Sequence, residues 1–316
     1  MVLVRLTDGP DAGKLVTTDI PFGPGAPNVR RGDRVVLINI PDAAPDQQYQ
    51  ILDQQRGFQL WMLVLAFAIA VIAFGRWRGL TALAGLAVTF AVLLLFIVPA
   101  ILAGRPPLLV AIVGSAAIML TVLYLTHGFN TATSVAVLGT LASLVLTGVL
   151  AAAATAVTQL TGIANENDSF LSSVYQNVNM RGLLLAGILI GALGVLDDVA
   201  VTQAVTVTEL AEANPAYTVW QLYGSASRIG RAHIASVINT IILAYAGASL
   251  PVLLLLAAAD QPVGDLLTSQ LLAQEIVRSI VGTIGLIAAV PITTALAALT
   301  AHHRAGLSPA SGGHRH

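Results

Sequence analysis

The sequence predicts an all-α polytopic membrane protein with about seven transmembrane helices, preceded by a small N-terminal β-domain. Of the 316 residues, 56% are hydrophobic and only 10% are charged, and the mean hydropathy is +0.82. Soluble proteins instead carry roughly 25% charged residues, because their surface is in contact with water. Long apolar runs recur along most of the chain, and its first part alternates in polarity as β-strands do.

The N-terminal segment has the pattern of β structure. Val2, Val4 and Leu6 alternate with other residues, Gly9 lies in a turn sequence, and Arg34–Ile38 reads as a second strand. A domain below ~40–60 residues is rarely stable without disulfides, a bound metal or oligomerisation, and this one begins directly on a strand. We therefore expect the β-domain to be partial, with more sequence preceding it.

Three domains are predicted: an extracytoplasmic β-rich domain at 1–56, a helical transmembrane domain at 57–301 and a short cytoplasmic tail at 302–316. Most apolar segments meet the ~20 residues that a spanning helix requires. They are Phe58–Phe74, Leu80–Leu102, Leu108–Leu125, Ala132–Val157, Leu183–Leu210, Ile234–Ala259 and Ile276–Leu299. Arg76-Trp77-Arg78 places an aromatic ring between two cations, which is typical of a membrane interface and predicts a helix end.

The arginines of the short loops predict the orientation, because positive charge is retained on the cytoplasmic side. With the N-terminal domain outside, the inner side holds Arg76, Arg78, Arg228, Arg231, Arg304 and Arg315, and the outer side holds Arg105, Arg181 and Arg278. We therefore expect the N-terminal domain outside and the C-terminus in the cytoplasm.

Adjacent acids, Asp197 and Asp198, lie deep in the fifth apolar segment. A carboxylate at that depth needs a protein interior, water or a partner, so a functional site is the default hypothesis. At ~100° per residue, Asp198, Thr202, Val205 and Glu209 share a stripe, and Gln203 is a further polar candidate in this segment. The alternative is that the helix simply emerges into water along Thr202, Gln203 and Glu209.

The sixth segment also carries polar residues into the membrane. His233, Ser236 and Thr240 share one face, with Asn239 beside them. We expect Asp198 to be buried between helices and to face Asn239 or Ser236. Asn239 is equally well explained as a hydrogen bond between helices. His233 has the chemistry to bind a metal or relay protons, or it simply lies at the interface.

Other charged residues have simple structural explanations. Arg228 and Arg231 are expected to anchor the inner end of the sixth segment, although either could neutralise the paired acids. Glu275 and Arg278 have the i, i+3 spacing of an ion pair on a helix surface.

A proline in the last segment, Pro291, is expected to kink the helix. Thr293 and Thr294 follow it, and their hydroxyls are able to satisfy the carbonyl groups that a proline frees. We therefore interpret both threonines as structural.

Several motifs together resemble the YibE/F family of bacterial membrane proteins. They are Gly191-Ala-Leu-Gly-Val-Leu-Asp-Asp-Val199, Glu209-Leu210 with Asn214-Pro215, Gly230-Arg-Ala-His-Ile-Ala-Ser236, Asn239-Thr240 with Leu243-Ala-Tyr-Ala-Gly247, and Val290-Pro-Ile-Thr-Thr294. The resemblance covers roughly Asp8 to Thr300 and implies a bacterial plasma membrane protein with a further N-terminal helix and a fuller extracytoplasmic β-domain. Ala232 stands where relatives commonly carry an acid. The resemblance implies an architecture and a candidate site, not a reaction.

Composition excludes several classes of protein. With a net charge of −1 and no run of Lys or Arg, the sequence does not indicate a basic surface that would bind nucleic acid. The chain has no cysteine, which excludes disulfides, thiolate metal sites and cysteine nucleophiles. No Ser/His/Asp arrangement, zinc-protease motif, Walker loop or dinucleotide fingerprint occurs, so the sequence favours a role other than catalysis.

Three functions follow from these observations. The leading hypothesis is a transporter or permease for an ion or small solute, using the intramembrane carboxylates, with no cofactor beyond a cation that they are able to bind. The first alternative is an intramembrane enzyme with a carboxylate or metal site, which the ~100° between adjacent helical residues weakens. The second is a membrane-anchored structural or signalling partner. The expected partners are the lipid bilayer, the solute and other copies of the chain.

Overall fold

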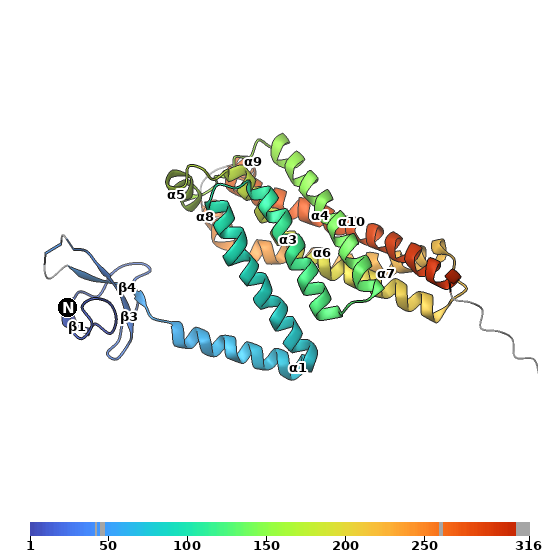
Figure 1. The fold of residues 1–316 in the computed structure, drawn as a ribbon. Helices are drawn as coiled ribbons and strands as arrows, with labels where there is room; N and C mark the ends of the chain where they lie inside the picture. Colours follow the sequence, from blue (N-terminus) through green and yellow to red (C-terminus); the bar gives the residue numbers. More distant parts are fainter. Residues whose placement is uncertain (42, 45–47, 259–261, 308–316) are drawn as a thin grey trace, which may run out of the picture. The chain divides into compact units, whose positions relative to one another are not determined.

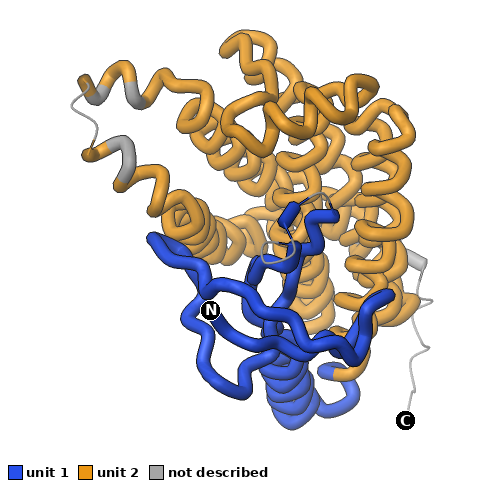
Figure 2. Tube along the Cα trace, turned by 90° about the vertical axis from the view of Figure 1, so that its left-hand side faces the viewer, with its two compact units in different colours: residues 1–79 blue, residues 80–316 orange. Residues whose placement is uncertain are grey.

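The computed structural model describes residues 1–41, 43–44, 48–258 and 262–307. These form two compact units, Met1–Gly79 and Leu80–His316 (Figure 2). The first contains the β structure and the beginning of a long helix, and the second is helical (Figure 1). This confirms the predicted fold class of a helical membrane protein with a small N-terminal β region.

The β structure consists of two antiparallel hairpins. β1 (Val2–Arg5) pairs with β2 (Leu15–Thr18), and β3 (Val35–Asn39) pairs with β4 (Tyr49–Gln54), with a register irregularity between Val36 and Leu37. The second predicted strand thus exists, shifted by one residue. The hairpins form two separate two-stranded sheets among the described residues, not one closed barrel.

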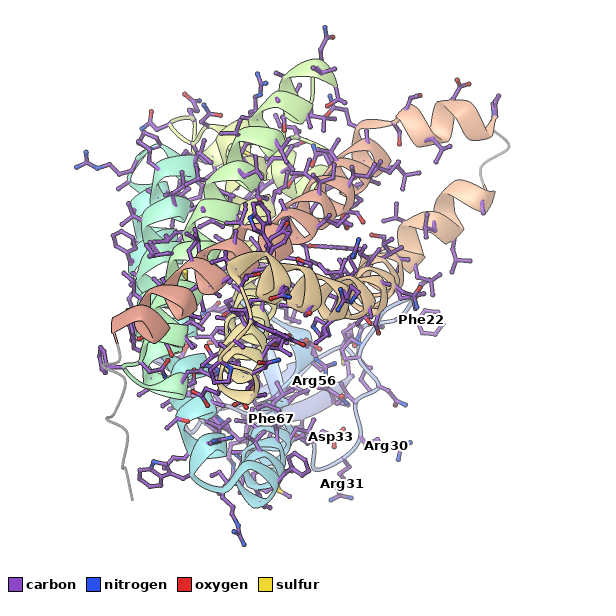
Figure 3. All side chains as sticks on the ribbon, turned by 90° about the vertical axis from the view of Figure 1, so that its right-hand side faces the viewer. Phe22, Arg30, Arg31, Asp33, Arg56 and Phe67 are labelled. Atoms are coloured by element: carbon purple, nitrogen blue, oxygen red, sulfur yellow. The ribbon has the colours of Figure 1, made fainter. Side chains whose placement is uncertain are left out.

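A polar contact ties the two hairpins together. The Tyr49 hydroxyl donates to Oδ2 of Asp11 at 2.6 Å, and Lys14 also donates to the Asp11 carboxylate. These bonds, that of Lys14 first, lower the pKa of Asp11 below its ordinary value. The apolar core is small, with Leu6 and Ile51 buried. Phe22 is fully exposed and points away from the strands, as do Arg30 and Arg31 (Figure 3).

The first long helix breaks at the predicted interface. α1 (Gly57–Val92) has non-helical geometry at Arg76, with φ 52° and ψ −126°. A residue other than glycine rarely adopts this conformation, which costs about 1–3 kcal/mol. Gly79 allows the corner, because a Cβ atom there would lie 2.3 Å from the carbonyl oxygen of Val71. Two of the predicted apolar segments therefore occupy one helix with a sharp break between them.

The rest of the chain is a series of helices with short connections. After α1 come η1 (Leu93–Ile97, a π-helical stretch), α2 (Val98–Leu102), α3 (Pro107–His127), α4 (Thr131–Val157), α5 (Glu166–Val174), α6 (Met180–Ala213), α7 (Val219–Ala248), α8 (Leu250–Ala258), α9 (Val263–Thr268) and α10 (Gln270–Leu307). Side chains cap several starts: Asn130 accepts from the Thr133 amide, Asn179 accepts from the Gly182 amide, and Thr218 forms a capping box with Gln221.

Six helical stretches of the described chain are long and apolar enough to cross a membrane. The first, Gly57–Leu102, has 46 residues and contains two predicted spans, while α3, α4, α6, α7 and α10 contain the others. The helix of the sixth span starts earlier than its predicted apolar segment. α7 begins at Val219, not Ile234, because the capping box starts it within a more polar sequence.

The expected ends of the last two spans also differ from the structure. The sixth was expected to end at Ala259, which lies outside the described residues, and α7 ends at Ala248 before the short α8. α10 continues past Leu299 to Leu307, through the first part of the expected tail. The remainder of that tail, 308–316, lies outside the described residues.

α6 is the central helix of the second unit and packs against α3, α4, α7 and α10 (Figure 1). Its buried face includes Leu189, Leu196, Val199 and Gln203. Helices α4 and α10 also pack closely against each other. The three helices α4, α6 and α10 therefore form the core that positions the site described next.

Candidate functional site

A cavity of about 660 Å³ opens at one end of the core helices. It lies between the start of α4, the end of α6, the α6–α7 connection and the last turns of α10. Its polar lining residues are Asn130, Thr131, Thr208, Glu212, Asn214, Tyr217 and Thr300. Its apolar lining includes Val135, Ala204, Leu222 and Ala297. We call this cavity the vestibule.

A buried cluster of polar side chains lies further into the core than the vestibule. It comprises Gln203 of α6 and Thr293 and Thr294 of α10, together with Thr140 of α4, which directly follows Gly139, the α4 residue that lies against Thr293. Each of the four has 0% of its surface exposed. The Thr294 hydroxyl donates to Oε1 of Gln203 at 2.9 Å. Gln203 directly precedes the vestibule residue Ala204, and Thr293 and Thr294 lie about one turn before Ala297. We call this cluster the polar seam.

Most polar groups of the seam lack a hydrogen-bond partner. Among the described residues, Nε2 of Gln203, Oγ1 of Thr140 and Oγ1 of Thr293 are buried and unpaired. Leaving such a group unpaired costs about 1–3 kcal/mol, and no lipid is able to replace the missing partner. These groups are therefore able to form hydrogen bonds with a bound water or polar ligand.

Glycines bring the helices to this seam. A Cβ atom at Gly230 of α7 would lie 2.7 Å from both Nε2 of Gln203 and Cγ1 of Val290. At Gly139 of α4 it would lie 2.2 Å from Oγ1 of Thr293. Small residues permit such close contact between helices in lipid. The seam is therefore enclosed by α4, α6, α7 and α10.

The paired acids lie elsewhere on α6. Asp198 is exposed on the isolated chain and Asp197 is half-buried. The one hydrogen bond between them runs from the backbone N–H of Asp198 to Oδ1 of Asp197, at 2.8 Å. Thr202 is half-buried and Glu209 is exposed, so the stripe predicted below Asp198 follows the outer side of the helix.

The expectation that Asp198 is buried between helices is wrong. On an ideal helix Asp198 lies about 140° from Gln203, which is at the centre of the buried face. In the described part of the chain its carboxylate has no hydrogen bond to Ser236 or Asn239. This removes the geometric basis for a solute site built on Asp198.

The polar face predicted on α7 also points outwards. Ser236, Asn239 and Thr240 are exposed, and the Thr240 hydroxyl donates to the carbonyl oxygen of Ser236 at 3.1 Å. His233 is half-buried, and its Nε2 has no partner within the described chain. Of the candidate residues named from the sequence, Gln203 is the one that lies in the polar seam.

The structure corrects the interpretation of Thr293 and Thr294. Both were expected to satisfy carbonyl groups freed by Pro291, yet Thr294 donates to Gln203 and Thr293 has no partner in the described residues. Thr140 was not a candidate at all. The sequence signal for the polar seam was the combination of Gln203 on α6 with the adjacent hydroxyls of Thr293 and Thr294 on α10, in helices that are otherwise apolar. None of these residues indicates the seam alone.

The remaining charged residues are simpler. Arg278 donates to Glu275 at 3.0 Å, which confirms the predicted ion pair. Arg228 donates to Ser225 at 3.1 Å, and in the described residues neither it nor Arg231 pairs with the acids of α6. The described residues contain no group of three or more His, Cys, Asp or Glu side chains arranged to hold a metal ion.

Comparison with known proteins identifies a family. The model of the YibE/F-like protein family matches residues 63–303, which is well over half of the chain. No curated protein and no solved structure matches it. The matched region contains the vestibule and the polar seam, and the long apolar helices place it in a membrane. The chain belongs to the YibE/F-like family of membrane proteins.

Proposed function

We propose that the protein is a permease for a small, neutral, polar solute, and that the solute passes from the vestibule through the polar seam. The observation that carries this proposal is the set of unpaired polar groups at Thr140, Gln203 and Thr293, buried among helices long enough to span a bilayer. A solute with hydrogen-bonding groups would satisfy them. Polar groups inside a membrane protein commonly mark such pathways.

The chemistry of the seam favours a neutral solute over an ion. Its groups are an amide and hydroxyls, and none of its members carries a charge. An ion leaving water for such a site needs a counter-charge or a full shell of ligands, because its transfer into a low-dielectric interior is very unfavourable. A neutral solute needs only replacements for its hydrogen bonds with water, which the amide N–H and the hydroxyls provide.

Replacing Thr293 with valine is expected to slow solute entry about tenfold, since a hydrogen bond between groups in the membrane is worth ~0.6–2 kcal/mol. Valine keeps the shape of threonine and replaces only the hydroxyl with a methyl group. The measurement is the reswelling rate of proteoliposomes in glycerol or urea, followed by light scattering, with K⁺ and Cl⁻ fluxes measured in parallel.

Thr155→Val is the matched control. Thr155 is also fully buried on α4, but its hydroxyl already donates to the carbonyl oxygen of Ala151 at 2.6 Å. This variant should transport like the parent chain. Equal rates for Thr293→Val and the parent, or ion flux without solute flux, would refute the proposed pathway.

We further propose that the N-terminal domain is outside the bacterial plasma membrane, so that the vestibule opens to the cytoplasm. The start of α4, the end of α6 and the last turns of α10 lie together at the vestibule, and the adjoining first half of α7 carries Arg228 and Arg231. Positive residues favour the cytoplasmic side. A fluorescent protein fused after His316 should therefore fluoresce, and alkaline phosphatase inserted near Asp46 should be active. Both fusion positions lie outside the described residues, and the reverse pattern would invert the orientation.

A further inference from the structure

An exposed acid lies near the middle of a helix that is long enough to cross a bilayer. Asp198 is near the middle of α6, which has 34 residues; at 1.5 Å per residue the helix is roughly 51 Å long. The side chain is exposed on the isolated chain. From that depth it is too short to reach the headgroups of a ~30 Å hydrocarbon core. Lipid tails offer it no hydrogen bond, so another group must cover it.

α7 presents a second uncovered polar surface. Its outer side carries Ala232, Ala235, Ser236, Asn239 and Thr240, all exposed. Only 11% of its most apolar window is buried inside the protein, against 56% for α6. The amide and hydroxyl groups on this outer side need hydrogen-bond partners, which lipid tails do not provide.

These two surfaces lie at the same depth. A Cβ atom at Gly230 would touch Gln203, and one at Gly191 would lie 3.2 Å from the Tyr245 hydroxyl. The two helices therefore run antiparallel, and interpolation between the contacts places Asp198 at the level of about Ser236. Asn239 follows within one turn. The acid of α6 and the hydrogen-bonding groups of α7 therefore lie at one level of the protein, and we call this set of exposed polar groups the band.

We infer that this band is the interface of a homodimer, in which Asp198 of each copy pairs with Asn239 of the other. A two-fold axis along the membrane normal keeps every residue at its own depth, so the acid of one copy meets the amide of the second. An asparagine amide both donates and accepts, and therefore pairs with a carboxyl group in either protonation state. Ala232 and Ala235 allow the facing helices to approach closely.

The absence of cysteine from the chain makes a direct test available. An Asp198→Cys chain and an Asn239→Cys chain, carrying different tags, are co-expressed and oxidised in native membranes. In a mixed dimer, one symmetry-related contact becomes a cysteine pair while the other keeps its Asp198 and Asn239. The dimer predicts a disulfide between the two tagged chains. Asp198→Cys with Val149→Cys, which is exposed on α4, should give none.

Two outcomes would overturn the dimer. Rapid labelling of Asn239→Cys by a membrane-impermeant maleimide, without cross-linking, would show that the band lines a water-filled crevice. Cross-linking of Asn239→Cys within one chain to Leu65→Cys would show that the apolar helix of the first unit covers the band. Neither readout uses transport, so the result is independent of the proposed permease.

Dissociation of the dimer provides a second measurement. Asp198→Leu is expected to raise the dimer dissociation constant in lipid about tenfold, since it removes two symmetry-related bonds. Asp198→Asn should change it less than about twofold, because an amide is able to pair with an amide. Equal effects of both substitutions, or a monomeric parent chain, would contradict the inferred contact.

Discussion

The Gly162→Ala variant is expected to lose about 2–5 kcal/mol of stability. Gly162 has φ +86°, a conformation that strains alanine. An alanine Cβ would also lie 2.2 Å from the carbonyl oxygen of Met180 and 2.8 Å from the Arg181 nitrogen. These atoms belong to the backbone at the start of α6, so relief of the clash requires movement of the central helix. Thermal unfolding of the detergent-solubilised protein, followed by tryptophan fluorescence, measures the loss.

Gly128 provides the control for conformational strain. Its φ is +76°, and a Cβ atom there would meet nothing within 4 Å. Its ψ is 175°, so Gly128→Ala should lose only the cost of a backbone conformation that residues other than glycine rarely adopt, about 1–3 kcal/mol. The difference between the two variants isolates the clash with the start of α6. Equal losses would show that this contact does not hold the loop in the folded protein.

Gly285→Ala is expected to destabilise the protein by about 1–3 kcal/mol through overpacking. The added Cβ would lie 2.0 Å from Oγ1 of Thr147 on α4. Thr147 is fully buried, and its hydroxyl is held by the Ser143 carbonyl oxygen at 2.7 Å. The side chain therefore has little room to move, and α4 and α10 must separate. Thermal unfolding again measures the loss.

A second substitution tests the cause of that loss. Thr147→Ala removes the atoms that clash, so the Gly285→Ala/Thr147→Ala double variant should be more stable than the sum of the single effects predicts. A coupling of about 1 kcal/mol or more is expected for two residues in direct contact. Additive effects would mean that α4 and α10 do not meet at these residues.

The spanning helices could be predicted from the sequence because their signal is composition summed over many residues. The break at Arg76 was equally visible, since cations flanking an aromatic ring rarely lie within a bilayer. The start of α7 was missed because the capping box at Thr218 precedes a stretch of only moderate hydropathy. Apolar content locates a span in the membrane better than it locates the ends of a helix.

The direction of each side chain was much harder to predict. α6 is apolar on nearly every side, so periodicity could not distinguish the face that packs against α4 and α10 from the face that leaves the protein. The position of Asp198 near the middle of a long helix was therefore predictable, and its exposure was not. Thr140 and Thr293 carried little signal, because a helical threonine usually bonds to its own backbone, as Thr155 does.

The small number of unpaired groups in the polar seam also bears on how long a solute would remain there. Each neutral hydrogen bond contributes about 0.5–1.5 kcal/mol, so three give about 1.5–4.5 kcal/mol. A dissociation constant of about 1 mM already corresponds to 4.1 kcal/mol. Binding in the seam would thus be millimolar or weaker, and the solute would dissociate rapidly. Weak binding of this kind favours a high transport rate, because slow release of a tightly bound solute would limit the flux.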